Sequence, residues 1–268
     1  MYLKFLLALS FAFTSLAQGQ SFDHSHSLWS EILQKNVLVL REGEASRLNY
    51  QNVDQKKLKK YTRSLLSASK KQVESWRREN QLAYYFNLYN ALTVERILKD
   101  YPLDSIRDLG SFFTSPWEEE FFTLFGEKAY LDKIEHEIVR GGDFNEPLLH
   151  FAFNCASIGC PALLNKAFVG KKLEEQLQKA TKNFLSDRLR NDLKARKKTL
   201  YVSKIFDWYG EDFEKGHRGF HSLKDFFKEY ADNLADTKKE KKKLLSGDYE
   251  IKFLSYDWDL NDTKTLKE

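Results

Sequence analysis

The sequence predicts an α+β domain in which a central buried helix packs against a sheet, after a helical N-terminal lead. Apolar residues are almost continuous over residues 81–99, and a helix that is apolar on all sides belongs in the core. Short segments in which apolar and polar side chains alternate, above all residues 147–155, are typical of strands. Because no internal repeat or long linker divides the chain, one α+β body is the simplest organisation.

The composition is that of a folded protein with a charged surface. Hydrophobic residues make up 42% and aromatic residues 15% of the 268 residues, which excludes a globally disordered chain. The net charge of +4 comes from 43 Lys and Arg against 39 Asp and Glu. A balance this even gives no reason to expect a nucleic-acid partner.

Residues 1–17 have the features of a signal peptide. Lys4 precedes a short apolar run, and Ser15 and Ala17 are the small residues expected before a cleavage site. The run is shorter than a membrane-spanning helix needs, although an uncleaved anchor is the alternative. We expect export to the periplasm or the exterior, and no later segment is apolar enough for a transmembrane helix in the mature chain.

The lead over residues 18–80 has helical patterns. Apolar residues recur at helical spacing over residues 27–40. Asp54 is placed to cap a helix that runs to about residue 67, and another helical segment begins at residue 72. Pro102 ends the central helix.

Asn87 and Asn90 interrupt the apolar character of the central helix. Asn is a poor helix former and is costly to bury without hydrogen-bond partners. Either the two amides bond to neighbouring backbone and fix the packing, or they belong to a site.

Residues 117–142 predict a hairpin followed by a short helix. Gly126 separates two apolar runs, as in a hairpin turn. Asp132 is expected to cap a helix over residues 133–140 that ends at Gly141. His136 and Arg140 share one face of this helix, which is either a surface ion-pair face or part of a site.

Residues 147–161 concentrate the chemistry of the chain. They hold both cysteines and one of the six histidines. In a strand, His150 and Asn154 would lie on one face and Cys155 on the other, and residues 157–161 would form a turn. A strand with one aromatic and one polar face would be a suitable floor for a polar site.

The C-terminal third predicts helices over residues 171–185 and 220–230 and strands over residues 199–202 and 251–254. The lysine run at residues 238–243 is typical of a solvated helix face. Two aromatic and acidic clusters follow, which together contain Asp207, Trp208, Tyr209, Asp212, Asp257 and Trp258. Each cluster is either a packing corner or the wall of a pocket for a peptide or sugar-like ligand.

Five segments of the chain resemble the domain of unknown function DUF547. In order they are FNLYNAL from residue 86, LDKIEHEIVR from 131, HFAFNCASIGCPAL from 150, IFDWYGEDF from 205 and YDWDLN from 256. The resemblance implies a domain over residues 81–262, with residues 18–80 as its helical extension and residues 263–268 as a tail. The family is similar to transglutaminase-like and papain-like cysteine hydrolases, which implies a central helix packed on an antiparallel sheet.

A transglutaminase-like site would place a Cys at the start of the central helix, a His on a strand, and an Asp or Asn on the next strand. By this resemblance His150 is the base and Asp207 its orienting residue. The helix position of the nucleophile is occupied by Asn87, which is a departure from the hydrolase pattern because an amide cannot be that nucleophile.

The two cysteines allow three alternatives. Cys155 and Cys160 form a disulfide, remain as buried free thiols, or supply a catalytic thiol. Cys160 lies beyond a turn and is the better placed to reach His150. The other histidines have no companion ligands at recognisable spacing, so the sequence predicts no metal site and no cofactor.

Two functions remain open. In the first, the protein is a thiol-dependent hydrolase or acyl transferase for amide bonds of peptides or envelope material. His150 is then the base, Asp207 or Asn154 orients it, and Cys155 or Cys160 is the nucleophile. In the second, a fold without hydrolytic activity binds a peptide, an envelope component or a protein partner in the same groove.

The resemblance also places an oxyanion site for the first function at the central helix. Asn87 or Asn90 would donate a hydrogen bond to the oxyanion and contact the substrate. Trp208 and Tyr209 would form a wall of the substrate site.

Overall fold

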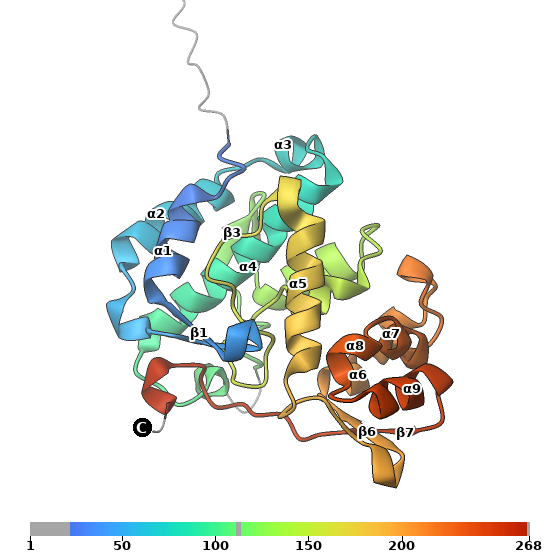
Figure 1. The fold of residues 1–268 in the computed structure, drawn as a ribbon. Coiled ribbons are helices and arrows are strands. Elements are labelled where there is room, and N and C mark those ends of the chain that lie inside the picture. The colour runs from blue at the N-terminus through green and yellow to red at the C-terminus, as the bar shows by residue number, and fades with distance from the viewer. Residues whose placement is uncertain (1–21, 111–113, 267–268) are drawn as a thin grey trace, which may run out of the picture.

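A computed structural model describes residues 22–110 and 114–266 (Figure 1). The expected signal peptide, residues 1–17, lies outside the described residues. Within them, no helix combines the length and the apolar character that are needed to cross a bilayer.

Helix α4, Arg78–Asp100, is the centre of the fold, as the sequence predicts. Its residues 82–94 are all buried, so nearly every side of the helix contacts protein. Figure 1 shows α1, Ser27–Asn36, and α2, Gln55–Leu66, on one side of α4. The short α3, Lys70–Glu74, leads into it.

The N-terminal lead packs on α4 through α2. Asp54 caps α2 as predicted, because its carboxylate accepts the backbone N–H groups of Lys56 and Lys57 at 3.0 and 3.1 Å. Trp29 of α1 stacks on Tyr61 of α2 with ring centroids 5.7 Å apart. The helix expected over residues 27–40 is wrong beyond Asn36, where the β-branched sequence VLVL forms a strand instead.

Three small sheets take the place of the single antiparallel sheet that the family resemblance implied. The hairpin β1–β2 joins Val37–Leu40 to Ala45–Leu48. The hairpin β3–β4, Phe122–Leu124 and Glu127–Ala129, turns at Gly126 as predicted. In the third sheet, β6 pairs antiparallel with β5 and parallel with β7; the three strands are Asp192–Lys194, Thr199–Val202 and Glu250–Phe253. The fold is therefore mixed α and β, with its sheets at the periphery.

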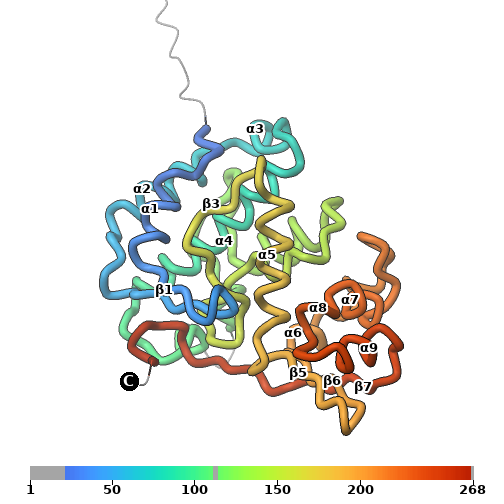
Figure 2. Tube along the Cα trace, in the orientation of Figure 1, coloured from blue at the N-terminus to red at the C-terminus, as the bar shows by residue number. Residues whose placement is uncertain are grey.

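Helix α5, Leu173–Ser186, leads from the α4 region to the C-terminal helices. Figure 2 shows these helices gathered beside β5, β6 and β7; they are α6, Ile205–Trp208; α7, Leu223–Glu229; α8, Ala231–Leu234; and α9, Lys238–Ser246. A cluster of buried phenylalanines holds this part together. Its central ring, Phe226, lies 4.6 Å from Phe213 and 6.0 Å from Phe151.

The strand predicted over residues 147–155 is wrong. Pro147–Phe151 is a 3₁₀-helix that Glu146 caps, its carboxylate accepting the backbone N–H of Leu148 at 3.1 Å. Every residue from 147 to 154 is buried, so no face is selected for polarity and the alternation carries no information about a strand.

Two buried amides of α4 fix the loops that cross it. Asn90 Nδ2 donates to the Ala152 carbonyl at 2.9 Å, and its Oδ1 accepts the Asn154 N–H at 2.8 Å. Asn87 makes the same pair of bonds with Phe168, at 2.8 and 3.0 Å. Each amide thus supplies hydrogen-bond partners for backbone groups that lie outside helices and strands.

Replacing Asn90 with Leu should lower the free energy of unfolding by about 2 to 4 kcal/mol, because two buried backbone groups lose their partners. Urea unfolding measures the loss, and the exposed Asn52→Ala is the control that should change it little. An Asn90→Leu protein as stable as the parent would contradict this role.

Candidate functional site

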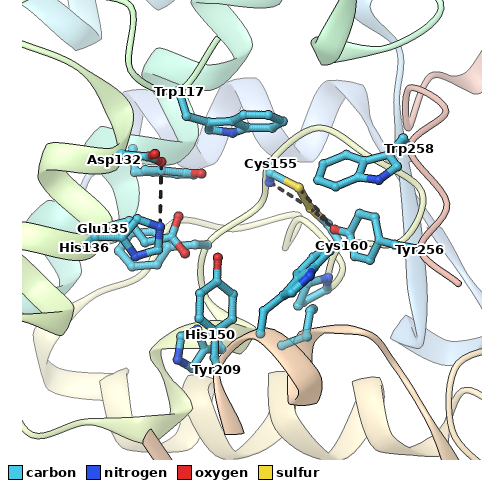
Figure 3. Close-up of a pocket in the computed structure, with 15 residues that line it drawn as sticks. Trp117, Asp132, Glu135, His136, His150, Cys155, Cys160, Tyr209, Tyr256 and Trp258 are labelled. Atoms are coloured by element: carbon cyan, nitrogen blue, oxygen red, sulfur yellow. Dashed lines mark hydrogen bonds and ion pairs between the residues drawn. A yellow bond between two sulfur atoms is a disulfide. The ribbon is translucent and has the colours of Figure 1, made fainter. Parts of the chain in front are cut away.

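A pocket of about 340 Å³ opens where the centre of the fold meets the C-terminal helices (Figure 3). Its lining residues come from α4, the segment before β3, the 133–140 helix and its start, and the 3₁₀-helix Pro147–Phe151. The others come from the loop over residues 152–161, here called the cysteine loop, from α6 and the residue after it, and from the C-terminal segment. They are Tyr89, Trp117, Asp132, Glu135, His136, His150, Phe153, Cys155, Cys160, Pro161, Ile205, Trp208, Tyr209, Tyr256 and Trp258.

One wall of the pocket is made of packed aromatic rings. The ring centroids of Tyr256 and Trp258 are 4.5 Å apart, and Trp208 lies 4.9 Å from Tyr256. Trp117 completes the group at 5.6 Å from Trp258. This aromatic wall, Trp117, Trp208, Tyr256 and Trp258, offers flat apolar faces on which a ligand can stack.

Cys155 and Cys160 are joined in a disulfide that lines the pocket. The Tyr256 hydroxyl lies 3.2 Å from Cys155 Sγ and 3.1 Å from Cys160 Sγ. Gly159 makes this contact possible, since a Cβ there would lie 2.9 Å from the Tyr256 ring. Of the three alternatives for the cysteines, the structure therefore has the disulfide, and its sulfurs face a phenol.

His150 is held by a carboxylate that the sequence interpretation missed. Its Nε2 lies 2.9 Å from Asp212 Oδ2, and its ring stacks on Tyr209 with centroids 4.4 Å apart. Asp212 also accepts from Arg140 Nε at 2.5 Å and Lys215 Nζ at 2.7 Å. These donors hold the pKa of Asp212 well below its ordinary value, although burial opposes them.

The prediction that Asp207 orients His150 is wrong. It pairs with Lys204 at 2.5 Å on a half-exposed part of α6. The two carboxylates lie in the same segment, IFDWYGEDF, but a turn after Tyr209 carries Asp212 back toward His150. Sequence spacing alone could not distinguish them.

The His150 imidazole is neutral and keeps one nitrogen free among the described residues. Burial lowers its pKa, and the hydrogen bond to Asp212 only partly offsets this effect. Since Nε2 faces the carboxylate, the proton lies there, and Nδ1 is left with a lone pair. Nδ1 is buried and has no hydrogen-bond partner in the described part of the chain.

Asp132, Glu135 and His136 form an acidic wall at one side of the pocket, away from Tyr256 and Trp258 (Figure 3). They lie on the wide-turned π-helix Lys133–Arg140 and at its start. Asp132 makes no capping bond, so that prediction is wrong; its carboxylate lies 3.8 Å from His136 Nε2 instead. The i, i+3, i+4 spacing in LDKIEHEIVR was the available signal that these side chains share a face.

The acidic wall has strongly shifted pKa values. Burial raises the pKa of Glu135 from its ordinary 4.5 to about 7, although a hydrogen bond from Tyr89 opposes the shift. Burial and the nearby Glu118 raise the pKa of Asp132 to about 6. His136 is neutral, because burial first, and then Arg140 and His150, lower its pKa to about 4.

The three asparagines expected in the site are structural instead. Asn87 and Asn90 do not line the pocket, and the loop backbone occupies their amides. Asn154 closes the cysteine loop: its Nδ2 donates to the Pro161 carbonyl at 2.8 Å, and its Oδ1 accepts the Ala156 N–H at 3.1 Å. The predictions that Asn87 and Asn90 contact the substrate and that Asn154 orients His150 are therefore wrong.

The remaining predicted residues, His150, Cys155, Cys160, Trp208 and Tyr209, all lie along the pocket. In residues 22–110 and 114–266, no group of three His, Cys, Asp or Glu side chains is placed to hold a metal ion.

The comparisons agree with the family resemblance. Residues 73–185 match the family described as "Protein of unknown function, DUF547", which is less than half of the chain. No curated protein and no solved structure matches the chain. The matched range includes the acidic wall, His150 and the disulfide, whereas Asp212, Trp208 and Tyr256 lie beyond it. The wider boundaries over residues 81–262 stay a prediction.

Glu135→Gln should stabilise the protein above neutral pH. The folded state binds the Glu135 proton more tightly than the unfolded state, so the parent loses stability as the pH rises from 4.5 to about 7. The variant should gain up to roughly 3 kcal/mol over the parent across this window, and almost nothing below it. Denaturant unfolding at several pH values measures the gain.

The matched control is Glu137→Gln, which changes an exposed carboxylate on the same helix. It should shift stability by the same small amount at every pH. A gain for Glu135→Gln that is independent of pH would contradict the shifted pKa.

Proposed function

We propose that the pocket binds a small group of a peptide or envelope component, and that the domain acts as a binding module. The observation that carries the proposal is the aromatic wall around a 340 Å³ pocket that also contains a few buried polar groups. Ligand sites have this composition, with apolar faces for affinity and few polar groups for orientation.

The disulfide favours binding over thiol chemistry in this state. A disulfide sulfur is no thiolate, and the polar contacts of both sulfurs are with the Tyr256 hydroxyl and the Cys155 backbone N–H. The export that residues 1–17 predict would place the pocket where such disulfides persist.

Binding should be detectable through the pocket tryptophans. The probes are a panel of N-acetyl amino-acid amides and N-acetylglucosamine, with intrinsic fluorescence and equilibrium dialysis as readouts. Trp208→Ala should weaken binding by about tenfold, since stacking of a ligand on an aromatic ring contributes of the order of 1 kcal/mol.

Phe253→Ala is the matched control. Both side chains are aromatic and 40% exposed, but Phe253 lies on β7 outside the pocket, so its removal should leave affinity unchanged. A panel with no binder, or equal losses in the two variants, would reject the binding function.

A second function is favoured by His150, Cys155 and Cys160, which line the same pocket, and by the bond of His150 to Asp212. After reduction, Cys155 or Cys160 would give its proton to His150 Nδ1 and attack an amide carbonyl, while Asp212 orients the imidazole. The imidazolium would return the proton to the leaving amine, and water or an acceptor amine would then release the acyl group. This is a thiol-dependent hydrolase or acyl transferase that is inactive while the disulfide is closed.

Alkylation by iodoacetamide tests this second function. The oxidised protein should show no reactive thiol, and the reduced protein should show one that reacts at pH 6.5 about tenfold faster than glutathione. His150→Gln should abolish the excess, whereas His221→Gln, an exposed histidine outside the pocket, should not. Two thiols with ordinary reactivity in the folded, reduced protein would exclude the mechanism.

A further inference from the structure

Among the described residues, the ionisable side chains that line the pocket include acidic groups but no Lys or Arg. Asp132 and Glu135 line it, and no Lys or Arg of the described chain does. The two lining histidines are neutral at physiological pH, because burial lowers both pKa values. Ionisation of either carboxyl group therefore leaves a negative charge without a protein cation in the pocket.

Arg140 does not neutralise the acidic wall. Its guanidinium bonds to Asp212 and Glu211, with its carbon 5.3 Å from the centroid of the Tyr209 ring. It lowers the pKa of Glu135 only as a minor influence, after burial and Tyr89. The guanidinium that lowers the pKa of Glu135 is thus committed to another pair of carboxylates.

The opposite side of the pocket is suited to a cation as well. The faces of aromatic rings carry negative charge and attract ammonium groups, most strongly at tryptophan. Trp117, Trp208 and Trp258 all line the pocket.

We propose that the pocket receives an organic ammonium group, which lies between the aromatic wall and the carboxylates of Asp132 and Glu135. This assignment rests on the binding function proposed above and names the chemical class of its ligand. A quaternary or primary ammonium on a peptide or envelope component has this chemistry.

The assignment accounts for one buried and one half-buried carboxyl group, Glu135 and Asp132, that have no cationic partner among the described residues. Burial disfavours their charged forms, and Glu118, Tyr89 and Arg140 modulate the effect. A bound cation would reverse it, so binding should release protons at pH 6 and almost none at pH 9. The affinity for the cation should rise with pH from about 5 to about 8, because binding no longer has to displace protons from carboxyl groups that are already ionised.

The test compares cations with neutral molecules of the same shape. Choline is compared with 3,3-dimethylbutan-1-ol, and butylammonium with butan-1-ol, by isothermal titration calorimetry at pH 8. At least one cation should bind about tenfold more tightly than its neutral counterpart. The preference should decrease at high salt, because the carboxylate of Asp132 is partly exposed to solvent and its counterions.

The double variant Asp132→Asn, Glu135→Gln should remove the preference for cations over neutral probes, and Glu137→Gln on the same helix should retain it. Proton release, measured in buffers of different ionisation enthalpy, should disappear with the double variant. Circular dichroism verifies that each variant is folded.

Three results overturn the assignment. If neutral and cationic probes bind equally, the pocket binds ligands but does not select ammonium, and only this inference fails. If neither cation binds while a member of the neutral panel does, the inference again fails alone. If no probe of either set binds, the binding function fails with it.

Discussion

The pocket depends on the amide of Asn90. A helix satisfies its own backbone, but the loop over residues 152–161 pairs with distant backbone at residues 156–159, which bond to residues 257–261, so groups of its first residues depend on side chains. Asn90 bonds to both sides of that loop, and Asn154 bonds across it to Pro161 and accepts from Asn261 at 3.1 Å. This chain of amides fixes the loop against α4, and the disulfide, His150 and the floor of the pocket take their positions from it. The asparagines are thus essential to the site without contacting its contents.

A second network joins the two halves of the molecule behind the pocket. Arg140, at the end of the π-helix, and His150 both bond to Asp212, which follows α6. Tyr209 lies between them, stacked on His150 and close to Arg140. The network places the C-terminal aromatic residues opposite the acidic wall. Because Arg140 is used in this junction, the carboxyl groups of the acidic wall remain without a protein cation.

Local signals predicted local structure well, and nonlocal contacts explain the failures. The uniform apolar character of α4, the Asp54 cap and the Gly126 turn each depend on nearby residues, and each prediction is confirmed. The strand at residues 147–155 is wrong because complete burial, imposed by α4 and α5, removes the meaning of alternation. In the site, the sequence identified the residues of the cysteine loop that line the pocket. It could not select Asp212 over Asp207, since that choice depends on how a turn packs against a helix far away in sequence.

The acidic wall shows why a sequence pattern alone does not reveal a site of this kind. Taken as sequence, Asp132, Glu135 and His136 belong to a polar helix of the kind that usually faces solvent. Here the residues three and four positions apart line one pocket that tryptophans also line, and the helix that carries them is a π-helix, an uncommon form that is frequent at functional sites. The acidic wall lies in the range that matches the family, whereas Trp208, Tyr256 and Trp258 lie after it. It follows that the matched range supplies the charge of the site together with Trp117, and the part of the chain after it supplies the other three rings of the aromatic wall.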